Sequence, residues 1–147
     1  MDKEEMLLVI NDTLLNFSKP INKPFLMFLR KDRFSKYLDM MELEKHIEYT
    51  PCFVAEMKEG SIIYFCEEII NNLTKEFNSE KKKLFLQAIT LHELLHIWNK
   101  LHVFTGEEAV FSESLVDKEL KAFYPRQHKI LQEIEKDNKK IYKVLRN

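Results

Sequence analysis

The chain has 147 residues, 45% of them apolar, which is enough to bury one hydrophobic core, and we expect a single domain over residues 1–147. Its 23 basic and 24 acidic residues give a net charge of -1, so no overall electrostatic field favours binding to nucleic acid. No apolar stretch approaches the ~18 residues needed to span a bilayer, and the acidic N-terminus is unlike a secretory signal. The composition therefore predicts a cytoplasmic protein with no membrane segment.

The N-terminal third is predicted to hold a helix, a strand and a less regular segment. Apolar side chains recur at helical spacing over residues 4–17, and Pro20 lies just beyond the end of that helix. A short apolar run over residues 25–30 is typical of a buried strand. Residues 31–50 carry a weaker pattern, from which we expect a helix that begins near Ser35.

A β-hairpin is predicted from two apolar runs, residues 52–57 and 61–66. We expect a three-residue loop between them, closed by Gly60 in the left-handed conformation, so that Met57 pairs with Ser61. One face of the hairpin would then be apolar enough to pack on helices. That face would carry Phe53, Ala55, Met57, Ile63 and Phe65.

The two cysteines belong to this hairpin. Under the same register Cys52 would lie opposite Cys66. In a reducing cytoplasm both would remain thiols, and we interpret them as small buried side chains rather than as a disulfide or a zinc site.

Three later segments have helical spacing. The first covers residues 67–77, and the second runs from about Glu80 to near Leu101 with Ser79 as its N-cap. The last is an amphipathic terminal helix over residues 126–146. The second helix is apolar over most of its circumference, which indicates that it is buried on most sides.

This buried helix carries the run His92-Glu93-Leu94-Leu95-His96, which has the form H-E-x-x-H. Residues four apart lie on one face of a helix, so the imidazoles of His92 and His96 can reach a single metal ion. Glu93 lies on the adjoining side, where it can deprotonate a metal-bound water instead of binding the metal. On a helix this spacing is typical of a zinc hydrolase, and we expect Zn²⁺ as the cofactor.

His102 is one candidate for a third metal ligand. It stands where the pattern H-E-x-x-H-x-x-G-x-x-H places its third histidine, and in this it resembles the metzincin metallopeptidases. Two features depart from that family. Asn99 replaces the glycine, and no methionine follows Met57 to form the methionine turn beneath the metal.

Glu113 is the favoured candidate, and Glu107 and Glu108 are lesser ones. Glu113 begins an E-x-x-x-D pattern, Glu113-Ser114-Leu115-Val116-Asp117, on a helix that is predicted to follow the motif helix. The arrangement resembles the gluzincin, or thermolysin-like, metallopeptidases, although Ser112 stands where that pattern has asparagine. It is also similar to the small minigluzincins and the ImmA/IrrE-type metallopeptidases, in which an apolar segment and a proline follow, as in residues 121–125.

The resemblance implies a zinc site with two histidine ligands and one glutamate ligand, formed by His92, His96 and Glu113. It also implies that Asp117 accepts a hydrogen bond from the outer nitrogen of a ligand histidine, which we expect to be His92. Related enzymes often place a group that stabilises the oxyanion beyond the glutamate helix. Tyr124 and His128 are candidates for that role, although both residues are also compatible with simple packing or surface positions.

We therefore expect an α+β, zincin-like fold with a small, mostly antiparallel sheet, a buried motif helix and a following glutamate helix. The resemblance implies a zinc-dependent metallopeptidase that acts on a peptide or protein substrate, with Glu93 as general base. Two alternatives stay open. One is a zinc-stabilised binding or regulatory domain with little proteolytic activity, and the other is a latent protease whose terminal helix blocks the cleft.

Overall fold

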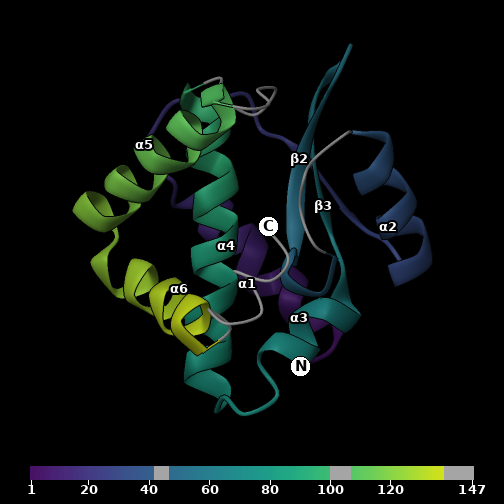
Figure 1. Cartoon of the computed structure of the whole chain (residues 1–147), viewed down its shortest axis with the longest axis vertical. Coiled ribbons are helices and arrows are strands. Elements are labelled where there is room, and N and C mark those ends of the chain that lie inside the picture. Colours follow the sequence, from purple (N-terminus) through teal and green to yellow (C-terminus); the bar gives the residue numbers. More distant parts are fainter. Residues whose placement is uncertain (42–46, 100–106, 138–147) are drawn as a thin grey trace.

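The computed structural model describes residues 1–41, 47–99 and 107–137, and the side chains of α5 are described from Glu113 onward. This part of the chain forms an α+β arrangement of six α-helices and a three-stranded sheet (Figure 1). A short 3-10 turn, Ile47–Tyr49, precedes the hairpin. The elements are α1 (Lys3–Leu15), β1 (Phe25–Phe28), α2 (Lys31–Met40), β2 (Cys52–Met57), β3 (Gly60–Phe65), α3 (Glu67–Leu73), α4 (Ser79–Asn99), α5 (Glu107–Phe123) and α6 (Pro125–Asp137).

The sheet has the order β1-β3-β2, so β3 is the central strand. β2 pairs with β3 in the antiparallel sense, as expected for a hairpin. β1 pairs with β3 in the parallel sense, because β2 begins at the end of the sheet where β1 ends, so that β2 runs back across the sheet and β3 repeats the direction of β1. The sheet is therefore mixed, with one parallel and one antiparallel pair of strands, and not mostly antiparallel as predicted.

The predicted register of the hairpin is wrong by one residue. Met57 pairs with Gly60 instead of Ser61, and Cys52 lies opposite Phe65 instead of Cys66. Gly60 has a φ of +139°, a conformation that side-chain-bearing residues rarely adopt, and it is the first residue of β3. Because this glycine belongs to the strand, two residues form the loop instead of three.

The register decides which side chains face which layer, because a slip of one residue turns a strand over. Phe53 and Ala55 share one face with Tyr64, whereas Ile63 and Phe65 share the opposite face with Cys52 and Val54. The apolar set predicted for a single face is thus divided between two. Both faces are buried against helices.

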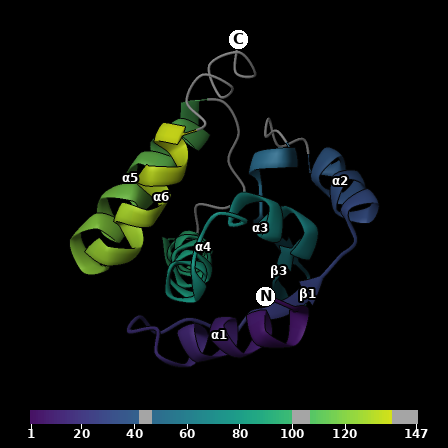
Figure 2. The same ribbon diagram turned by 90° about the horizontal axis from the view of Figure 1, so that it is seen from below.

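Helices cover the sheet from both sides. On one side, α1 and α4 pack their apolar side chains against Val54, Ile63 and Phe65. On the other side, α2 contributes Phe34 and Leu38, and α3 contributes the buried Ile69. α2 begins at Lys31, ahead of the predicted Ser35. Figure 2 shows α1 along one side of the molecule, α2 and α3 on the other, and α5 and α6 together beyond α4.

α4 is the central helix, as its apolar sequence predicts. Its buried residues run almost without a break from Phe85 to His96. The helix begins at Ser79, and its capping residue is Asn78, whose Oδ1 accepts a hydrogen bond from the backbone N–H of Lys81 at 2.9 Å. The prediction of Ser79 as N-cap is therefore wrong by one position.

α5 and α6 form a pair on the side of α4 that faces away from the sheet. Val116 and Leu120 of α5 pack against Leu91 and Leu95 of α4. Ile130 of α6 is buried in the same core cluster as the sheet residues. The terminal helix was predicted over residues 126–146, of which those after Asp137 lie outside the described residues. No helix among the described residues is long and apolar enough to cross a membrane.

Candidate metal centre

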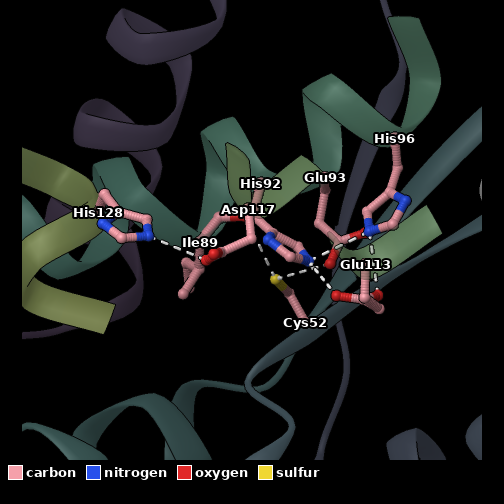
Figure 3. A network of polar contacts seen from close by, with 8 residues as sticks. All are labelled: Cys52, Ile89, His92, Glu93, His96, Glu113, Asp117 and His128. Carbon is pink, nitrogen blue, oxygen red and sulfur yellow. Dashed lines mark hydrogen bonds and ion pairs between the residues drawn. The ribbon is translucent and has the colours of Figure 1, made fainter. Parts of the chain in front are cut away.

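The two histidines of the motif converge as the sequence predicts. His92 and His96 lie one turn apart on α4, and their Nε2 atoms are 3.1 Å from each other (Figure 3). The ring planes are inclined by 70°, so the two rings approach each other edge to face around a common point. A helix produces this convergence without any long-range contact, because side chains four residues apart are neighbours on its surface.

Glu113 completes the cluster from α5. Its Oε2 is 3.0 Å from Nε2 of His92, and its Oε1 is 3.1 Å from Nε2 of His96. The packing of Val116 and Leu120 on α4 holds α5 alongside the motif helix, so that the preceding turn of α5 presents the carboxylate to both rings. The structure thus brings together the three residues expected as ligands, from two different helices.

The donor set fits a zinc ion. Two nitrogens bound to one tetrahedral zinc at about 2.05 Å stand about 3.3 Å apart. In the structure the Nε2 atoms are 3.1 Å apart, and the nearest carboxylate oxygens are at nearly the same distance from them. Within the described residues, His92, His96 and Glu113 form the grouping that can hold a metal ion. Two imidazoles and a carboxylate are also the ligand types that zinc accepts in catalytic sites.

The cluster is buried on the α4 side and open on the α5 side. The side chain of His96 is 6% exposed and that of His92 is 21% exposed, whereas that of Glu113 is 45% exposed. Solvent reaches the cluster from the side of Glu113.

Glu93 lies outside the metal-binding group, and its role as a general base stays a prediction. Its side chain is directed to the start of β2, where Oε1 is 4.0 Å from Sγ of Cys52. Glu93 is only 5% exposed, so its carboxylate is more deeply enclosed than Glu113. The sequence interpretation missed the approach of Cys52 to Glu93, because the contact depends on how β2 is placed against α4. The sequence itself carries no local signal for it.

Asp117 and His128 form a pair between α5 and α6. Oδ1 of Asp117 is 3.0 Å from Nε2 of His128, and the histidine is buried whereas the carboxylate is exposed. In Figure 3 His128 stands apart from the three cluster residues, with Asp117 in between. This contact assigns Asp117 a partner that was not predicted. The expected hydrogen bond from His92 to Asp117 remains a prediction.

Tyr124 contacts the segment that follows α1. Its hydroxyl is 3.3 Å from Oγ of Ser18, in the segment that follows α1, and its ring packs against the contact between α4 and α5. His128 likewise directs Nε2 to Asp117. The structure therefore gives each candidate oxyanion stabiliser a contact of its own, and the oxyanion role of both residues stays a prediction.

The metzincin alternative depends on a turn at Asn99, and α4 remains helical through that residue. The amide of Asn99 donates hydrogen bonds to the carbonyl of Leu95 at 2.9 Å and to Oε2 of Glu119 at 3.2 Å, which ties the end of α4 to α5. His102 lies outside the described residues. Glu107 and Glu108 belong to the first turn of α5, where the structure describes the backbone.

Comparisons of the chain with protein-family models, with curated proteins and with solved structures gave no match.

Proposed function

We propose that this protein is a zinc-dependent metallopeptidase in which His92, His96 and Glu113 bind the metal and Glu93 is the general base. The observation that carries the proposal is the convergence of two imidazole nitrogens and one carboxylate within hydrogen-bonding distance of one another. A carboxylate directly after the first histidine, on the same helix but outside the group, supplies the base that such chemistry needs.

Zinc bound at this group would supply Lewis acidity, which makes water a nucleophile at neutral pH and polarises a carbonyl. The chain supplies the proton transfer. Glu93 would take a proton from the attacking water and later donate it to the leaving amine. The resemblance to gluzincins selects the peptide bond as the target. Within the described residues β2 is an edge strand of the sheet and lies beside α4, and an extended peptide would lie along it.

A second candidate function is a zinc-stabilised binding or regulatory domain. The deep enclosure of Glu93 favours it, because a base that is 5% exposed leaves little room for a peptide beside the carboxylate. Under this proposal the metal would join α4 to α5 and contribute to folding, and hydrolysis would be absent.

The test measures cleavage of internally quenched peptides by the zinc-loaded full chain and by its Glu93→Gln variant. We expect Glu93→Gln to retain zinc and to lower the rate by about 100-fold or more, because it removes the base and keeps the shape. Glu133→Gln, which changes a carboxylate in a surface ion pair with Lys81, is the matched control and should cleave normally. Full activity in Glu93→Gln would disprove the assignment. Zinc binding without any cleavage by the parent protein would favour the binding domain.

A further inference from the structure

Cys52 is the first residue of β2, and its thiol reaches the carboxylate that the proposed function uses as a base. Sγ lies 3.8 Å from the carbonyl oxygen of Ile89 and 4.0 Å from Oε1 of Glu93 (Figure 3). Ile89 and Glu93 are four residues apart on α4, so the two acceptors are neighbours on one face of the helix. The thiol has one hydrogen to donate, and the carbonyl of Ile89 already accepts a hydrogen bond within the continuous helix, which favours the carboxylate oxygen of Glu93 as the acceptor.

The register of the hairpin brings the thiol to this place. Cys52 pairs with Phe65, and both side chains face the core cluster that contains α1 and α4. Phe53, the next residue, faces the opposite cluster under α2. A shift of β2 by one residue would replace the thiol beside Glu93 with a phenyl ring, which cannot donate a hydrogen bond.

Because Glu93 is buried, a hydrogen-bond donor beside its carboxylate stabilises the folded protein. A buried polar group without a hydrogen-bond partner is unfavourable, and a carboxylate oxygen can accept such a bond. The cysteine hydrogen offers such a donor from the buried side, where Cys52 is itself enclosed. Because a thiol is a weak donor, it orients Oε1 without binding it as tightly as a hydroxyl would.

We propose that Cys52 is a positioning residue for Glu93, and that its S–H···Oε1 hydrogen bond fixes the direction of the general base. The inference rests on the proposed function, since that function gives Glu93 its role. It adds a residue from the sheet to a site otherwise built from helices.

Infrared spectroscopy of the S–H stretch tests the contact without any activity measurement. The chain has two cysteines, so Cys66→Ala leaves Cys52 as the single thiol. Cys52→Ala leaves Cys66, a buried thiol whose pKa burial raises, so this control sulfur keeps its proton at neutral pH. We expect Glu93→Gln to shift the S–H band of Cys52 to higher frequency and to leave the band of Cys66 unchanged, in both zinc-free and zinc-loaded protein. An unmoved Cys52 band overturns the proposal. So does a band that vanishes on zinc loading, because Cys52 would then be a ligand.

Kinetics of the zinc-loaded full chain provide the second measurement. We expect Cys52→Ala to lower kcat by about three- to tenfold with KM and zinc content unchanged, and Cys52→Ser to restore part of the loss. Cys66→Ala is the control and should match the parent. An unchanged kcat in Cys52→Ala overturns the positioning role. If the parent cleaves no peptide but the Cys52 band still responds to Glu93→Gln, the proposed peptidase function fails and the hydrogen bond stands.

Discussion

The imidazoles of His92 and His96 use their Nε2 atoms toward the cluster, which leaves the Nδ1 atoms directed away from it. A metal-binding histidine usually donates a hydrogen bond from its outer nitrogen to a carboxylate or carbonyl, which fixes the ring. The sequence was sufficient to predict the helical pair, because the spacing of four is local. It was also sufficient to select Glu113, but only through its resemblance to a family pattern. The contacts of Asp117 with His128 and of Cys52 with Glu93 join distant elements, so no local pattern predicts them.

Asp117 provides the prediction at this scale. If it serves His92 as expected, Asp117→Ala should weaken zinc binding by about 10- to 100-fold in competition with a chelating dye. His128→Gln, which alters the partner seen in the structure, should weaken zinc binding less. Equal zinc affinity in Asp117→Ala and the parent would mean that the carboxylate serves the α5–α6 contact and not the metal.

The helices and strands were predicted to different degrees, for physical reasons. α1 and α4 were close to their predicted ranges because their apolar spacing extends over several turns. A strand was also anticipated over residues 25–30, but it is shorter, Phe25–Phe28, and Phe25 and Met27 are exposed instead of buried, because β1 is an edge strand among the described residues. The hairpin register was missed because Gly60 is able to pair as a strand residue while holding a positive φ, and the sequence alone favours the longer loop. The start of α4 was missed by one residue because Asn78 and Ser79 are both good capping residues.

The cap of α4 is testable by two single substitutions. Asn78→Ala should lower the free energy of unfolding by about 1 kcal/mol, because the backbone N–H of Lys81 loses its acceptor. Ser79→Ala, inside the first turn, should change it by less than about 0.5 kcal/mol. Urea denaturation of both variants provides the measurement. A larger loss of unfolding free energy in Ser79→Ala than in Asn78→Ala would show that Ser79 is the N-cap.

At the scale of the whole molecule, α4 lies between the sheet with α1 on one side and the α5–α6 pair on the other (Figures 1 and 2). Composition and spacing predicted the α+β class and the central burial of α4. They did not predict the strand order or which helices share a layer, because these depend on contacts between residues far apart in the chain. The position of α6 shows this most clearly. Its Ile130 is buried in the main core, whereas an inhibitory helix that only covers a cleft would not need a side chain in the core.

Truncation distinguishes a core helix from an inhibitory one. A chain that ends at Pro125 should lose roughly 3 kcal/mol or more of unfolding free energy, because it loses the buried Ile130 and the partly buried Leu131 and Ile134. A chain that ends at Asp137 keeps α6 and is the control. Thermal unfolding followed by circular dichroism measures the difference. A shorter chain that stays folded and cleaves peptides faster than the parent would support the latent protease instead.

The central claim is that Glu113 is the third ligand of a zinc site, and zinc content tests it most directly. Purified parent protein, dialysed against zinc-free buffer, should retain about one zinc ion per chain. We expect the same content in Glu93→Ala and His102→Ala, and loss of the metal in His92→Ala and Glu113→Ala, because only the last two remove a ligand atom from the observed cluster. Loss of zinc in His102→Ala together with its retention in Glu113→Ala would contradict the account.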